Sequence, residues 1–359
     1  METLRKYLNH RFLLVLYLLL ISVIFYKTYD RIFDKKVHLG GDNAGYYIYG
    51  KSLAKGEGYR AIHTKEKTKA NHFPPGYPAL IATVMMVFDA RINTIKKANG
   101  FYMFAALMVL FFLFRALTKN IHLSFVACLL TLLNYHLLEY STIMMSEISF
   151  VLFSAISLLL FVFVDFKEEY ESKLTLYLLA LSAAILIPIA RIAGYPISNA
   201  WFTDNPIFLS LLLLAVLTII IANWKPRKSP LNNPLFLLFV ASIVFAFYIR
   251  TLGISLFLAF FIILLVQKRW RYAAVLASVF ILTTLPWQIR SDKLGGNSYV
   301  NQLFQKNPYR PELGPMTIAD WPDRVLMNVK RYLALEITSA VLPFENIDYK
   351  QAVAQLKSE

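Results

Sequence analysis

Long apolar runs recur along the chain, and short polar turns separate them. A run of about 18 or more apolar residues can cross the hydrocarbon core of a bilayer as a helix, and the pattern predicts about nine such spans. A shorter apolar stretch at 77–88 is expected to lie in the membrane interface. The predicted spans lie near residues 12–28, 98–116, 122–140, 146–164, 174–190, 206–223, 234–249, 254–267 and 272–287.

The composition agrees with a membrane protein. Hydrophobic residues make up 57% of the 359 residues, charged residues make up 16%, and the mean hydropathy is +0.51. These values lie far outside the averages for soluble globular domains. We therefore predict an all-α fold, a polytopic bundle of transmembrane helices.

The positions of Lys and Arg predict the orientation of this bundle, because short loops rich in these residues stay on the cytoplasmic side. The pattern places the N-terminus inside and the C-terminus outside. No small-residue cleavage site follows the first run, which is therefore predicted to be a retained signal anchor. The basic residues precede the first run or lie in alternate turns, at Arg5, Lys6, Arg11, Arg115, Lys119, Lys167, Lys173, Lys225, Arg227, Lys228, Lys268, Arg269 and Arg271.

This topology divides the chain into two regions. A transmembrane domain at 1–290 carries a long first outer loop at about 29–97, and a polar outer tail follows at 291–359. An amphipathic stretch near 323–342 is expected to cap the outer face. The net charge of +15 follows mainly from the topology, the outer loop and the tail, so we expect a lipid bilayer as partner and no nucleic acid.

The first outer loop contains the most distinctive polar motif, the run Gly40-Gly41-Asp42-Asn43-Ala44-Gly45-Tyr46-Tyr47. Its glycines let the backbone approach a ligand closely, and Asp42 could act as a general base. Alternatively, Asp42 caps a helix that runs from Asn43, since Asp is a favoured N-cap residue. Tyr46 and Tyr47 suit either a sugar ring or the membrane interface. The run Pro74-Pro75-Gly76-Tyr77-Pro78 predicts a stiff corner before an apolar helix.

Further candidates lie at the predicted outer ends of spans. Glu147 follows Ser146 at the start of the fourth span, where it is either functional or a helix-start residue with Ser146 as cap. Arg250 either binds a phosphate or reaches for lipid headgroups, and Arg191 is a competitor for the same role. Trp287 is expected as an interface anchor, and Arg290 as a headgroup contact or a second phosphate ligand.

The cysteine and histidine content gives no support to a disulfide, a thiolate metal site or a zinc site. The single cysteine, Cys128, lies within an apolar run, which predicts packing rather than a disulfide or a thiolate metal site. The six histidines are dispersed, so a zinc site has no support in the sequence. Asp42 with the distant Glu147 is compatible with metal-free chemistry or with a weakly held divalent cation.

In their order and sidedness, these motifs resemble the GT-C superfamily of polytopic glycosyltransferases, in particular bacterial members related to protein mannosyltransferases and to the aminoarabinose transferase of lipid A. The resemblance covers roughly residues 10–290. It implies an enzyme of the bacterial inner membrane that transfers a sugar from a polyprenyl-phosphate donor to a lipid, glycan or protein acceptor at the outer face.

The resemblance also implies roles for residues. Asp42 would deprotonate the acceptor hydroxyl, Glu147 would orient the acceptor or the sugar, and Arg250 would stabilise the departing lipid phosphate. His72 stands where related transferases often place a Lys or a second acid. The implied substrate-binding set comprises Asn43, Tyr46, Tyr47, His72, Tyr77, Arg191, Arg250 and Arg290.

Other interpretations stay open. Family members commonly continue with further spans, so the polar tail leaves a short subfamily, a truncated gene product and an inactive relative as alternatives. A transporter or flippase for lipid-linked sugars should carry ionisable or helix-breaking residues in the middle of its spans, whereas the candidates lie at span ends. A non-catalytic scaffold for envelope assembly would be indifferent to Asp42.

Overall fold

The computed structural model describes residues 2–34, 40–166, 230–295, 304–306 and 311–337, and this part of the chain is helical without a β-strand. The all-α prediction is therefore confirmed for the described residues. The helices are α1 (Glu2–Ile32), α2 (Asp42–Ala54), α3 (Gly76–Val87), α4 (Ile92–Thr118), α5 (Ile121–Leu132), α6 (Tyr135–Ser141), α7 (Glu147–Phe163), α11 (Pro234–Ile249), α12 (Gly253–Val266), α13 (Trp270–Lys293) and α15 (Asp320–Arg331). The short 3-10 turns η2 (Pro230–Asn232) and η3 (Pro311–Leu313) accompany them, and a π-helical turn, η4 (Tyr332–Glu336), continues α15.

Three described helices are long and apolar enough to cross a membrane, namely α1 over Arg11–Ile32, α4 and α13. Helices α5 and α6 together would make a fourth span, although they are bent by 64° at the break between them. The predicted span at 122–140 is thus a broken helix. Helices α7, α11 and α12 are apolar but shorter, and the spans predicted at 174–190 and 206–223 lie outside the described residues. A total of nine spans stays a prediction.

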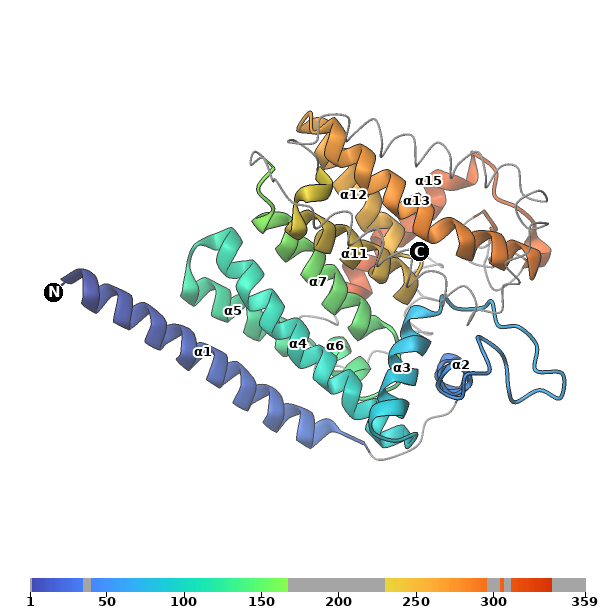
Figure 1. Ribbon diagram of the computed structural model, residues 1–359, viewed down its shortest axis with the longest axis horizontal. Helices are drawn as coiled ribbons and strands as arrows, with labels where there is room; N and C mark the ends of the chain where they lie inside the picture. Colours follow the sequence, from blue (N-terminus) through green and yellow to red (C-terminus); the bar gives the residue numbers. More distant parts are fainter. Residues whose placement is uncertain (1, 35–39, 167–229, 296–303, 307–310, 338–359) are drawn as a thin grey trace.

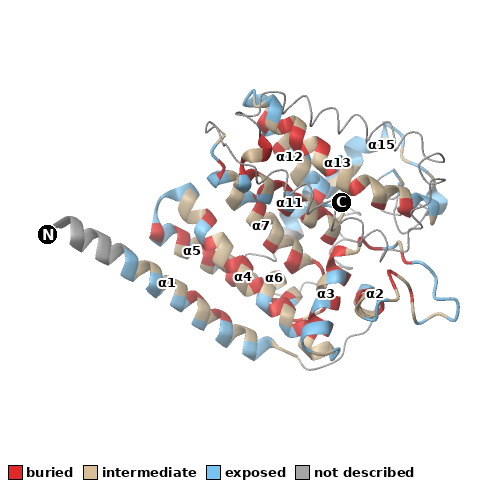
Figure 2. Ribbon diagram, in the orientation of Figure 1, coloured by how far each residue is buried: buried red, intermediate tan, exposed pale blue. Residues whose placement is uncertain are grey.

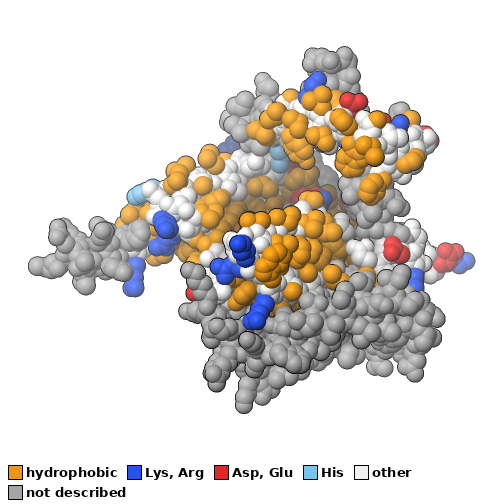
Figure 3. All heavy atoms as spheres, turned by 90° about the horizontal axis from the view of Figure 1, so that it is seen from above, with side chains coloured by type: hydrophobic (Ala, Val, Ile, Leu, Met, Phe, Trp, Pro, Cys, Tyr) orange, Lys and Arg blue, Asp and Glu red, His pale blue; other side chains and the backbone are white. Residues whose placement is uncertain are grey.

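The outward faces of several helices are apolar, as expected for a protein in lipid. On α1, Phe12 and Val23 are exposed, and on α12 the same holds for Ile262 and Val266. Figure 3 shows hydrophobic side chains over much of the described face, with Lys and Arg side chains gathered in a few places. Large contiguous apolar surfaces are rare on soluble monomers, so this surface supports a membrane protein.

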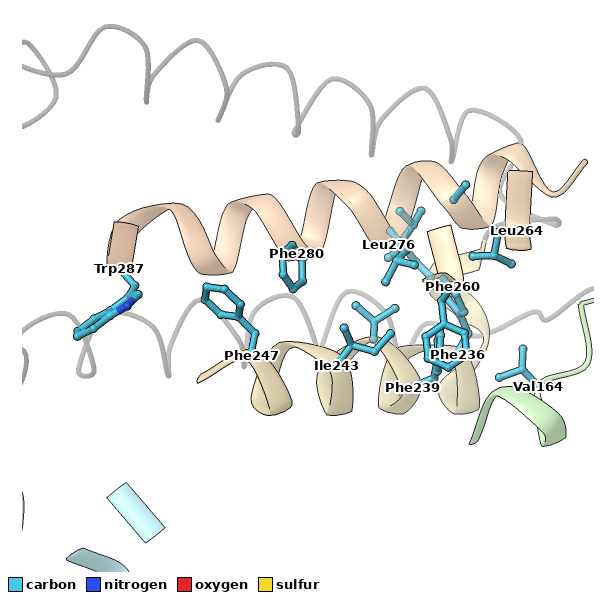
Figure 4. Packing of buried hydrophobic residues seen from close by; sticks show 14 of the residues in the cluster. Val164, Phe236, Phe239, Ile243, Phe247, Phe260, Leu264, Leu276, Phe280 and Trp287 are labelled. Atoms are coloured by element: carbon cyan, nitrogen blue, oxygen red, sulfur yellow. The ribbon is translucent and has the colours of Figure 1, made fainter. Parts of the chain in front are cut away.

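The larger core forms where α11 packs against α7, α12 and α13. Aromatic side chains of α11, among them Phe239 and Phe247, face Phe280 and Leu276 of α13 (Figure 4). Trp287 belongs to this core and is only 7% exposed. The prediction that Trp287 anchors the chain in the membrane interface is therefore wrong, because the ring packs inside the protein against Tyr59 of the outer loop.

A second core lies between α1, α4, α5 and α7. The ring of Tyr29 on α1 packs directly against Gly100 of α4, where an added Cβ atom would lie 2.4 Å from the ring. Cys128 is buried here, and its thiol donates to the carbonyl of Leu107 at 3.3 Å. The predicted packing role of Cys128 is confirmed.

The region predicted as the first outer loop, whose described residues 40–97 we call the first outer segment, contains two helices, α2 and α3, and is less loop-like than the pattern predicted. The expected corner at Pro74–Pro75 is confirmed, since Pro75 is the N-cap of α3. Helix α3 buries seven residues and packs against α2, α4 and α11, so most of the stretch 77–88 is part of the bundle, while its last residues, Met86, Val87 and Phe88, are exposed at the surface. Gly76 is needed there, because a Cβ atom would lie 2.5 Å from the backbone of Tyr248.

The candidate residues lie at helix ends that share one side of the molecule. In Figure 1 the chain ends of α1 and α11, the starts of α2, α3 and α7, and the end of α13 all lie toward the right of the molecule. The opposite ends of α4 and α13 lie further to the left in this view, and the basic residues Lys119 and Lys268 adjoin them in the sequence. This arrangement agrees with a common outer face for the candidate residues.

Candidate functional site

An ion pair between Glu147 and Arg250 forms the centre of the candidate site. Glu147 is the first residue of α7, and Arg250 is the C-cap of α11, so two helix ends meet here. The side chains are 24% and 34% exposed, and the second carboxylate oxygen of Glu147 is buried without a hydrogen-bond partner among the described residues. Charged groups held so near apolar helices are costly unless paired, which is why the pair is informative.

Ser146 joins this pair to the first outer segment. Its hydroxyl accepts from Arg250 Nη1 at 3.3 Å and lies 3.0 Å from the hydroxyl of Tyr46. Ser146 is the N-cap of α7, yet its side chain makes no capping hydrogen bond. The capping role considered for Ser146 is therefore wrong, because the hydroxyl contacts other helices instead. We call Tyr46, Ser146, Glu147 and Arg250 the polar cluster.

Asn99 of α4 holds the turn that precedes the polar cluster. Its amide nitrogen donates to the carbonyl of Ile143 at 2.5 Å and to that of Met145 at 2.9 Å. Its side-chain oxygen accepts from the hydroxyl of Tyr77 at 3.1 Å. Asn99 is almost completely buried, so these bonds fix the backbone immediately before Ser146.

Asp42 lies at the start of α2, one helical turn before Tyr46. The helix begins at Asp42, its N-cap is Gly41, and no side-chain capping bond is present. The capping interpretation of Asp42 is therefore wrong, although its charge lies in the first turn, where the helix dipole favours an acid. Asp42 is exposed, and residues four apart share a helix face. The carboxylate thus lies on the side of α2 that leads to the polar cluster through Tyr46.

The other predicted site residues of the first outer segment have varied surroundings. Asn43 is partly buried next to Asp42. The hydroxyl of Tyr47 donates to the carbonyl of Ala90 at 3.1 Å. His72 is exposed with its ring edge-on to Phe73, and Tyr77 is buried in the core with Asn99. Only His72 among these four residues is exposed, as Asp42 is.

Arg290 binds backbone of the outer loop. Its guanidinium donates to the carbonyl of Ala70 at 2.7 Å and to that of Tyr59 at 3.4 Å, and it lies over the rings of Tyr59 and Trp287. Burial raises the pKa of Tyr59 well above its ordinary value, so its hydroxyl stays protonated and donates to Phe73 at 2.9 Å. Arg290 therefore joins α13 to this loop.

Sequence patterns missed two contacts that build this site. Asn99 lies at the start of a predicted span, shortly after Lys96 and Lys97, where a single amide resembles an ordinary polar residue of a span end. Asn71 donates to the carbonyl of Leu294 at 2.9 Å and so also ties the loop to the end of α13. Arg191 lies outside the described residues.

The described residues contain no group of three or more His, Cys, Asp or Glu side chains arranged to hold a metal ion. Comparisons of the chain with protein-family models, with curated proteins and with solved structures find no match.

Proposed function

We propose that this chain is a multi-pass glycosyltransferase of the bacterial inner membrane, with the GT-C-like topology described above. It would transfer a sugar from a polyprenyl-phosphate donor to an envelope acceptor at the outer face. The observation that supports this proposal best is the polar cluster: an arginine and a carboxylate, paired at two helix ends, on the same side of the bundle as the exposed Asp42.

The chemistry assigns a separate task to each charged group. The acceptor oxygen forms a bond to the anomeric carbon as the bond from that carbon to the phosphate oxygen breaks. The acceptor proton goes to Asp42, and the electron pair leaves with the lipid phosphate. Arg250 then faces the developing negative charge on the phosphate, where a guanidinium stabilises the transition state.

Glu147 has a positioning task in this scheme. Its ion pair orients the guanidinium of Arg250, and the hydroxyl of Ser146 contacts the same nitrogen. A guanidinium whose position is fixed before the donor binds needs less reorganisation during the reaction. The phosphate would displace or share part of this pairing when the donor binds.

Transfer of radiolabelled sugar from polyprenyl-phosphate donors, measured in vesicles that contain the purified full chain, tests the proposal. We expect transfer by the native chain, and a loss of at least about a hundredfold in Asp42→Asn, which removes the base but keeps the shape. Glu66→Gln is a matched control, because Glu66 is an exposed acid of the same outer segment. It should transfer sugar normally.

Two results would contradict the proposal. Equal rates for Asp42→Asn and the native chain would remove Asp42 from the chemistry. No transfer from any donor by a folded native chain would contradict the enzyme as a whole. Movement of a lipid-linked sugar between leaflets without transfer would indicate a flippase. The absence of both transfer and movement would favour a non-catalytic scaffold.

A further inference from the structure

Helix α15 in the outer tail has two chemically different sides. Trp321, Val325, Val329 and Leu333 follow one another at intervals of four residues, which places them on one side of a continuous helix. All four side chains are exposed, with Val325 at 53% and Leu333 at 63%. We call these four residues the apolar stripe. No residue of α15 is buried, as Figure 2 also shows.

Polar contacts hold the other side of α15 to the protein. Arg324 donates to the carbonyl of Gln305 at 3.1 Å and contacts the sulfur of Met316 at 2.7 Å. The carboxylate of Asp320 accepts from the backbone and hydroxyl of Thr317, both at 2.7 Å. These bonds lower the pKa of Asp320, so the group is charged at neutral pH. The polar side is thus attached to the preceding segment, and the apolar stripe faces outward.

The side chains of α15 fit one kind of surface. Amphipathic helices that lie in a membrane interface combine a charged side with Trp, Leu and similar residues on the other. Trp is favoured at this depth because its ring is apolar and its N–H is polar. Lys330 and Arg331 in the last turn can reach anionic headgroups, and the net charge of +15 favours such a surface.

The rest of the chain makes a bilayer the expected neighbour. Helix α13, which is long and apolar enough to cross a membrane, ends at Lys293, shortly before the segment that leads to α15. A chain that leaves a membrane there emerges at its surface, which brings a bilayer within reach of α15. We propose that α15 is an interfacial helix that lies in the headgroup region of the bilayer with its apolar stripe toward the acyl chains. This inference is independent of the glycosyltransferase proposal.

Fluorescence quenching on the full-length chain tests this inference. Cys128→Ser removes the only cysteine, and single cysteines are then introduced by Val325→Cys or Val329→Cys on the apolar stripe and by Asp323→Cys on the polar side. Each variant is labelled with an environment-sensitive fluorophore in vesicles of phosphatidylcholine and phosphatidylglycerol. The quenchers are a lipid with a nitroxide near the top of its acyl chain, and aqueous iodide.

We expect the lipid nitroxide to quench labels at 325 and 329 at least severalfold more than the label at 323, with the order reversed for iodide. Strong iodide quenching at all three positions would show that the apolar stripe faces water. Protection from both quenchers at 325 and 329 would show that protein covers the stripe. Either result would overturn the inference.

A second pair of variants tests the cause of the contact. With the label at Leu333→Cys, the change Val329→Glu should abolish most quenching by the lipid nitroxide, because a charge on the stripe opposes burial in lipid. Asn328→Glu adds the same charge beside the stripe, and quenching by the lipid nitroxide should be retained in this variant. Because both positions are exposed, folding should be kept, which the midpoint of thermal unfolding checks. Equal quenching in both variants would contradict the proposed contact.

Discussion

The hydroxyl groups of Tyr46 and Ser146 lie 3.0 Å apart, although a hundred residues separate them along the chain. This contact joins the first outer segment to the start of α7. Asp42 lies one helical turn before Tyr46, so the contact links the start of α2 to the segment that carries the ion pair of Glu147 and Arg250. The candidate site is therefore assembled from segments that are distant in sequence, and the contact itself can be tested.

Replacement of Tyr46 by Phe should weaken this junction while keeping the ring, which packs against Phe73 and Tyr77. The loss of one hydrogen bond should lower the free energy of unfolding by about 0.5–1.5 kcal/mol. Thermal unfolding in detergent measures it. Tyr47→Phe is the control, because Tyr47 contacts Ala90 at a more exposed place and should matter less. A larger effect of Tyr47→Phe would contradict the junction.

Glu147 and Arg250 should depend on each other energetically. In a double-mutant cycle of Glu147→Gln, Arg250→Gln and the double variant, we expect a coupling of about 0.5–3 kcal/mol, below the range for fully buried pairs because both side chains are partly exposed. Unfolding by denaturant in mixed micelles gives the values. The pair Asp89–Arg91 is the control, since exposed ion pairs should couple weakly. Additive effects at Glu147 and Arg250 would show that the pair is not energetically linked.

Asn99→Leu should loosen the turn that carries Ser146 and Glu147. The change leaves the carbonyls of Ile143 and Met145 without their amide donor, which should lower the free energy of unfolding by about 1–3 kcal/mol. Faster hydrogen exchange in residues 142–147 would reveal the local effect.

Asn93→Leu, on the same helix, is the control for Asn99→Leu. The side-chain oxygen of Asn93 has no hydrogen-bond partner among the described residues, so Asn93→Leu should leave hydrogen exchange in residues 142–147 unchanged. Equal exchange in the two variants would mean that Asn99 does not hold the turn.

The sequence predicted the class of this fold better than its contacts. Apolar runs were sufficient to predict most of the longer helices, and Pro75 marked the start of α3 as expected, but the caps considered at Asp42 and Ser146 are not formed. The same runs could not show that the segment 122–140 is bent, or that Trp287 is buried. Those features depend on which helices become neighbours, and hydrophobic periodicity carries no information about neighbours.

The candidate site divides in the same way. Glu147 and Arg250 could be proposed because charged residues at the ends of apolar runs are conspicuous. Their pairing could not be predicted, because it depends on how α7 and α11 pack. Arg290 and Arg250 looked equivalent in the sequence, yet the guanidinium of Arg290 donates to backbone carbonyls of the loop. Only the tertiary structure distinguishes an arginine that holds backbone from one that is paired with an acid.

The segment between α2 and α3 offers a direct test of the role of Arg290. The guanidinium of Arg290 donates hydrogen bonds to the carbonyls of Ala70 and Tyr59, next to the short bridge between Arg60 and Lys69. The single ammonium of Arg290→Lys cannot reproduce this fork, so the loop should open more often. Because Lys65 and Lys67 lie in this loop and are exposed, trypsin should cleave there several times faster in the variant than in the native chain.

Arg269→Lys is the control for this experiment, because Arg269 precedes the start of α13 at the opposite end of the same helix. Cleavage of the outer loop should be unchanged in that variant. If Arg290 instead served a lipid phosphate, Arg290→Lys would reduce sugar transfer while the loop kept its resistance to trypsin. If Arg290 holds the loop backbone, trypsin must cleave Arg290→Lys faster than the native chain. Unchanged cleavage would contradict this role.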